Sequence, residues 1–196
     1  MKQGSRAPAD FGATLVRMLL VRIVPITVAA WMPFAYSSCA AASNPSTVKE
    51  AAVQASGPHY VFAHYMVTLF AYGADVASYE KEIRLAQAAG IDGFALNCAA
   101  WRLEPRYKAR ARMIYDAADR VGNFKLFFSA DMVGRLTADD VRDMVTTFGR
   151  RKSQFTQNGR IVLSTFLADR YGPEFWQNQV LQPLAAQGYP VFFVPH

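Results

Sequence analysis

The chain has 196 residues, of which 52% are hydrophobic and 18% are charged. This composition supports a sizeable buried core and excludes a wholly disordered protein. The formal net charge is +6, but the first 42 residues hold four basic residues and one acidic residue, which leaves only +3 for the rest. So small an excess gives no reason to expect nucleic acid as a partner.

Residues 1–42 are predicted to be an export signal. The segment from Met18 has an early arginine, an apolar run and a small-residue end suited to cleavage after Ala42. Met18 is an alternative start, because the residues before it are polar and unlike the first part of a signal. The expected location is therefore secreted or periplasmic.

Two alternatives to a cleaved signal stay open. An uncleaved membrane anchor is one, but Arg22 and Pro25 interrupt an apolar run that is already short, so no stable membrane span is expected. Lipidation of Cys39 is the other, although Tyr36 stands where a lipidation motif usually has an aliphatic residue.

Residues 43–57 are small and polar and are predicted to be a linker to a folded domain over 58–196. Once the signal is removed, Cys98 is the single cysteine, so no internal disulfide can form. His59, His64 and His196 are scattered and no CxxC motif occurs, so the sequence indicates neither a metal site nor a cofactor.

From residue 59 onward, apolar strand-like runs alternate with amphipathic helical patterns. Ser78 and Thr137 are candidate helix caps, and Gly90 is suited to a left-handed helix end. The predicted strands are 59–66, 91–97, 124–131, 160–166 and 190–194, and the predicted helices are 78–89, 106–121, 137–148 and 173–187.

This alternation predicts an α/β fold with a parallel sheet. A doubly wound sheet would suit the same pattern, but the first strand is not followed by GxGxxG, which removes the main support for a dinucleotide fold. A TIM-type (β/α)₈ barrel has eight strands and about 250 residues. The five predicted strands therefore indicate a partial barrel, whose open sheet edges could support self-association.

Polar residues stand at the carboxyl ends of the predicted strands, which is the rim where barrel enzymes carry their catalytic groups. Asp131 is the candidate catalytic residue there, and the alternative is an acid that bonds backbone amides at the strand end. His64 and Asn97 close other strands and are candidate ligands for sugar hydroxyls, each with a structural alternative, and Thr165 is a further candidate. Trp101, in the loop after the second strand, could stack on a sugar ring or simply pack in the loop.

Five motifs carry a resemblance to glycoside hydrolase family 71, the α-1,3-glucanases or mutanases. They occur in the family's order over about 135 residues, and they are VFAHYMV (61–67), AAGIDGFALN (88–97), FKLFFSAD (124–131), NGRIVLSTF (158–166) and GYPVFFVP (188–195). The resemblance implies a TIM-type barrel that hydrolyses α-1,3-glucan with inversion at the anomeric carbon. It also implies that Asp131 matches an essential carboxylate, and that the partner is a polysaccharide.

The sequence departs from the family pattern in two ways that concern the chemistry. Ala130 replaces the aromatic residue of the family's Ser-Phe-Asp motif, and the later Trp-Asn-Asp-x-Gly-Glu-Ser segment, which holds two further carboxylates, is absent. Asp169 is only a loose substitute for these acids. A truncated, non-catalytic fragment that at most binds carbohydrate is therefore the alternative function.

Overall fold

The structure is a computed structural model that describes residues 20–21, 59–68 and 75–196. Apart from Leu20–Val21, the expected export signal, the linker and Cys39 lie outside the described residues, so those expectations stay predictions. Leu20–Val21 forms β1, which pairs antiparallel with β2. Within the described part of the chain, no helix is long and apolar enough to cross a membrane.

Five parallel strands form the body of the sheet and follow one another across it in sequence order. This order confirms the predicted α/β architecture and is that of a barrel wall, whereas a doubly wound sheet would reverse direction. The strands are β2 (Phe62–Met66), β3 (Gly93–Cys98), β4 (Lys125–Asp131), β6 (Arg160–Phe166) and β7 (Val191–Val194).

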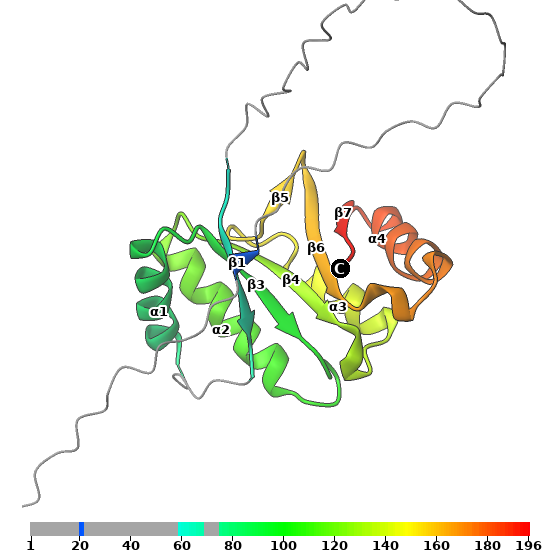
Figure 1. The fold of residues 1–196 in the computed structure, drawn as a ribbon, viewed down its shortest axis with the longest axis horizontal. Coiled ribbons are helices and arrows are strands. Elements are labelled where there is room, and N and C mark those ends of the chain that lie inside the picture. The colour runs from blue at the N-terminus through cyan, green and yellow to red at the C-terminus, as the bar shows by residue number, and fades with distance from the viewer. Residues whose placement is uncertain (1–19, 22–58, 69–74) are drawn as a thin grey trace, which may run out of the picture.

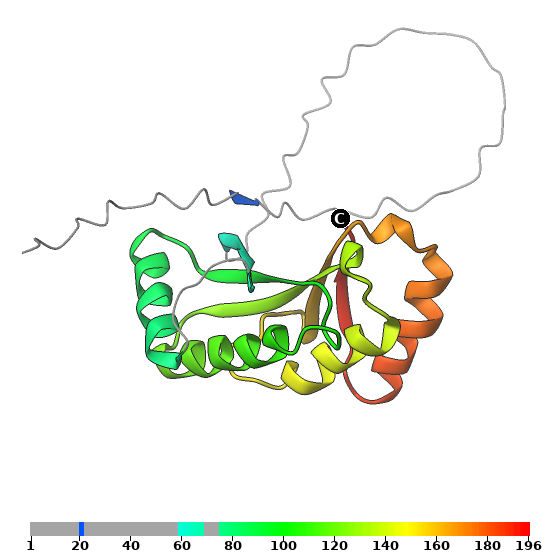
Figure 2. The same cartoon turned by 90° about the horizontal axis from the view of Figure 1, so that it is seen from below.

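The helices all lie along one face of the curved sheet, as Figures 1 and 2 show. They are α1 (Val76–Ala88), α2 (Arg106–Val121), α3 (Ala138–Phe148), a π-helical turn η3 (Phe175–Leu181) and α4 (Gln182–Ala186). The predicted single helix over 173–187 is thus π-helical over the seven residues Phe175–Leu181 and α-helical after them. No helix among the described residues covers the opposite face, which we call the open face.

Local sequence signals explain most of the boundaries. Thr137 and Asp140 form the expected capping box of α3, and Gly90 adopts the left-handed conformation after α1, with φ of 77°. The predicted Ser78 cap is wrong, because the Asp75 side chain accepts the Ser78 N–H and α1 begins at Val76. Two short 3₁₀ turns follow strands, η1 (Met132–Gly134) and η2 (Ala168–Arg170).

Neither β1 nor β5 (Thr156–Gln157) was predicted as a strand. β5 pairs antiparallel with β6 through a hairpin whose two turn residues, Asn158 and Gly159, both have positive φ. An Asn-Gly pair is a strong signal for such a turn. The Asn-Gly pair therefore predicts the hairpin turn, although the two-residue strand is too short to show a hydrophobic period.

Apolar side chains form two separate clusters. The larger lies between the sheet and the helices and includes Leu96, Tyr115, Phe128 and Phe148. The smaller lies on the open face toward the amino ends of the strands and comprises Phe62, Phe127, Phe155 and Val162. Side chains alternate between the two faces along a strand. The cluster to which one residue belongs therefore fixes the face to which each remaining residue of that strand points.

Candidate functional site

The carboxyl-terminal half of the open face carries polar side chains in place of the aromatic cluster. Asp131 lies four residues beyond Phe127 on β4, so its side chain is on the same face. Residues paired between neighbouring parallel strands also share a face, and Asn97 pairs with Ser129 while Asp131 pairs with Phe166. We call this edge of the open face the rim.

Both oxygens of the Asp131 carboxylate accept a hydrogen bond. Asn97 Nδ2 donates to Oδ2 over 3.3 Å, and the backbone N–H of Val133 donates to Oδ1 over 3.0 Å. The second bond caps η1, which begins directly after the strand. Asp131 is therefore held at the rim by a neighbouring strand and by its own turn, and it remains partly exposed.

Asn97 has one unpaired acceptor. The residue is only 3% exposed, and its Oδ1 atom has no hydrogen-bond partner in the described part of the molecule. Its Nδ2 atom faces the Asp131 carboxylate, so the amide cannot be turned over without placing two oxygens together. A buried amide oxygen of this kind needs a donor, and a ligand hydroxyl would supply one.

Asp131 and His196 both lie close enough to His64 to shift its pKa electrostatically. Burial lowers the pKa of His64 below 6.5, the Asp131 charge opposes this shift, and His196 adds to it. The half-buried imidazole is therefore neutral at pH 7, with one nitrogen that can donate a hydrogen bond and one that can accept. Three predicted site residues, Asp131, Asn97 and His64, thus gather at the rim.

The structure places the other two predicted site residues on the helix-covered face. Thr165 pairs with Ala130, so it faces away from Asp131; it is fully buried and its hydroxyl accepts the His196 N–H. Trp101 is 2% exposed and packs edge-on against Phe128. Neither side chain is brought together with Asp131.

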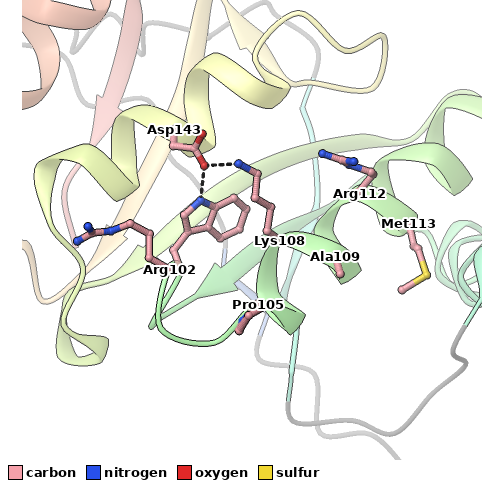
Figure 3. A pocket seen from close by; sticks show the side chains of 8 residues that line it. Arg102, Pro105, Lys108, Ala109, Arg112, Met113 and Asp143 are labelled. Atoms are coloured by element: carbon pink, nitrogen blue, oxygen red, sulfur yellow. Dashed lines mark hydrogen bonds and ion pairs between the residues drawn. The ribbon is translucent and has the colours of Figure 1, made fainter.

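Trp101 instead forms the wall of a groove on the outer surface between α2 and α3, shown in Figure 3. The groove has a volume of about 590 Å³, and Trp101 Nε1 and Lys108 Nζ both donate to Asp143 Oδ2 there, each over 2.7 Å. None of its lining residues belongs to the rim. The Trp101 side chain belongs to the core and exposes only 2% of its surface, so it offers no ring face to a ligand in this groove.

Several rim residues were not predicted as site residues. Ser129 and Ser164 lie on the open face in one paired row with Asn97, and Phe166 closes β6 beside Asp131. Counting every second residue back from Asp131 and across the strands would have found them, because parity fixes the face. The position of a residue at the end of a strand does not by itself fix the face on which its side chain lies.

Gly134 joins the two loops that border the rim. A Cβ atom at this position would lie 2.2 Å from Ala99 Cβ and 2.8 Å from Ala100 N. Only glycine allows so close an approach. The turn after Asp131 is therefore packed directly against the loop after β3.

Asp169 and Cys98 are two further groups that could take part in chemistry, and neither is hydrogen-bonded to Asp131. Asp169 is exposed on η2 and lines a second groove with Trp176 and Phe193, and no recorded contact joins it to Asp131. Cys98 pairs with Ala130 on the helix-covered face, where burial raises the pKa of its thiol. Among the residues that the structure describes, no three or more potential metal ligands cluster.

The same architecture occurs in solved structures of the GH99 endo-alpha-mannosidase from Bacteroides thetaiotaomicron. One matches with a TM-score of 0.54 at 15% identity and covers 68% of this chain and 51% of that chain. Another matches with a TM-score of 0.50 at 16% identity and covers 62% of this chain and 37% of that chain. At this identity the likeness concerns the fold.

Curated relatives are similar over 65–69% of this chain. The glucan endo-1,3-alpha-glucosidase agn1 of Schizosaccharomyces pombe is 39% identical and covers 69% of this chain and 33% of its own length. A mutanase of Penicillium rubens is 29% identical, with 65% of this chain and 28% of its own length covered. The ascus wall endo-1,3-alpha-glucanase of S. pombe is 30% identical, with 69% and 32% covered.

The chain thus spans about a third of the length of these relatives. The model of glycosyl hydrolase family 71 matches residues 57–196, which include all five parallel strands and the rim. The expected family resemblance is confirmed, and the chain belongs to glycosyl hydrolase family 71.

Proposed function

We propose that the rim forms part of a site that binds and hydrolyses α-1,3-linked glucan, with Asp131 as one of its carboxylates. The observation that carries this proposal is the position of Asp131 at the carboxyl end of β4 on the open face, where it accepts a hydrogen bond from Asn97 and acts electrostatically on His64. The names of the relatives, a glucan endo-1,3-alpha-glucosidase, a mutanase and an endo-1,3-alpha-glucanase, support the choice of substrate.

The chemistry follows from the groups that the rim presents. Inverting hydrolysis uses one carboxylic acid to protonate the leaving oxygen and one carboxylate, about 6.5–9.5 Å away, to activate water. Asp131 can fill one of these roles, and neutral His64 can donate to or accept from a sugar hydroxyl. Asn97 would bind substrate through Oδ1 while its amide nitrogen keeps the carboxylate in place.

Carbohydrate binding without hydrolysis is the second candidate. The observation that favours it is that Asp131 is the one carboxylate among the described rim residues; the others are His64, Asn97, Ser129, Ser164 and Phe166. Binding needs only the hydroxyl-recognising groups and an apolar surface, whereas inverting hydrolysis needs both acids.

One pair of assays separates these functions. The chain is mixed with insoluble α-1,3-glucan, and both co-sedimented protein and released reducing ends are measured, with cellulose and starch as other glucans. We expect retention on α-1,3-glucan above the other two. Hydrolysis predicts that Asp131→Asn lowers release by about 100-fold or more, as for loss of a general acid or base.

Asp139→Asn is the matched control, because Asp139 is an exposed acid in the first turn of α3 on the covered side. Release that survives Asp131→Asn would remove Asp131 from the chemistry. Retention without release would leave the binding function alone. Equal retention on all three glucans would contradict both candidates.

A further inference from the structure

Phe166 is an exposed aromatic residue beside the candidate catalytic carboxylate. It closes β6, pairs in register with Asp131 on β4, and is 40% exposed although large aromatic residues are usually well buried. Paired residues of neighbouring strands are about 4.8 Å apart in the backbone. The ring and the carboxylate can therefore contact the same small ligand.

The local backbone holds this ring in place. Leu167, the next residue, has a left-handed conformation with φ of 57°, which is unusual for a branched side chain and turns the chain sharply at the strand end. Ala168 N–H then donates to His196 O over 3.0 Å. The His196 ring packs edge-on to Phe166, with the ring centroids 6.3 Å apart and an interplanar angle of 80°.

The groups around Phe166 are those that a sugar ring requires. A pyranose has an apolar C–H face and a perimeter of hydroxyls, so its sites combine an aromatic surface with hydrogen-bonding groups. Across β3, β4 and β6 the rim offers in order Asn97, Asp131 and Phe166. Asn97 adds a buried amide oxygen that no described residue bonds, which is an acceptor for a ligand hydroxyl.

We propose that Phe166, supported by His196, is a stacking platform for one glucose residue of an α-1,3-glucan bound at Asp131. This inference rests on the proposed function and adds the residue that recognises the apolar face of the sugar. The platform contributes affinity through contact area, and its position next to the carboxylate fixes which sugar residue lies at the reacting centre.

The test is titration calorimetry of the full chain with the α-1,3-linked glucose tetramer. Phe166→Leu keeps the apolar character but removes the ring, and we expect it to raise the Kd by about fivefold to tenfold, the loss expected for part of an aromatic contact. Phe166→Trp keeps a flat ring and should hold the Kd within about threefold of the wild-type value.

Tyr60→Leu is the matched control. Tyr60 is 38% exposed and packs against Phe155 at the amino end of the sheet, away from the rim, so its loss should leave the Kd unchanged. Wild-type affinity in Phe166→Leu, with normal binding of the tetramer by the wild-type chain, would overturn the platform alone. Failure of the wild-type chain to bind the tetramer would overturn the proposed function and the platform together.

Discussion

The two faces of the sheet are built on different principles. On the helix-covered face, aromatic and aliphatic side chains form one large buried cluster, in which the ring centroids of Tyr115, Phe128 and Phe148 are 4.7–5.8 Å apart. On the open face, a small aromatic cluster occupies the amino ends, and polar groups with an unpaired acceptor occupy the carboxyl ends.

Together with the proposed function, this difference separates stability from recognition within one sheet. Full burial of apolar surface provides most of the folding free energy, so the covered face carries stability. The rim contributes little burial and keeps groups that are not fully satisfied by the protein. Substitutions on the two faces should therefore change different measurements.

The largest effect is expected on the covered face. Phe128→Ala removes a side chain that is 2% exposed and contacts Trp101, Tyr115 and Phe148, so it should lower the free energy of unfolding by about 3–5 kcal/mol. Phe166→Ala, its counterpart on the rim, should cost less than about 1 kcal/mol. Urea denaturation of both variants measures the difference, and similar losses would contradict the division between the faces.

An intermediate effect is expected at the amino end of the open face. In Gly93→Ala the new Cβ would lie 2.1 Å from Lys125 O and 2.5 Å from Phe62 Cε1, so strand or ring must shift, at a cost of about 1–3 kcal/mol. Gly172→Ala is the control, because no atom lies within 4 Å and its φ is not in the left-handed range. Equal melting temperatures for the two variants would show that this part of the sheet is not tightly packed.

The smallest effect concerns pH. Because burial lowers the pKa of His64 below 6.5, the unfolded chain binds the proton more readily than the folded chain. The free energy of unfolding should therefore fall as the pH is lowered from 6.5 through the folded pKa. The loss should stay below about 1 kcal/mol, since the half-buried imidazole is partly screened by water.

His64→Gln should remove this part of the pH dependence, measured as the difference in unfolding free energy between pH 7.5 and pH 5. His59→Gln removes an exposed histidine at the other end of the sheet and serves as the control. An unchanged slope in His64→Gln would mean that His64 is not the group that titrates.

The elements were predictable because each has a local cause. The Thr137–Asp140 capping box, Gly90 and the apolar strand runs all act within a few residues. The cap at Asp75 was missed because two plausible caps stood three residues apart. The π-helical turn over Phe175–Leu181 has no local signal that distinguishes it from an α-helix.

The composition of the rim was predictable only where strand ends and strand faces coincide. Asp131, Asn97 and His64 lie on the open face, so placing them at strand ends was sufficient. Thr165 lies one residue before Phe166, and that single step turns it toward the helices. The buried Trp101 donates its Nε1–H to Asp143 on α3, which is 42 residues later in the sequence. No local sequence pattern shows such a contact.

The contact at Gly134 limits how the rim can diversify. Since this residue admits no side chain against Ala99, the turn that holds Asp131 and the loop after β3 should shift together, as one rigid piece. Variation in loop length is better accommodated at Leu103, whose side chain is 66% exposed, than at the alanines before it. Changes in what the rim accepts can thus arise from the outer part of that loop without disturbing the carboxylate.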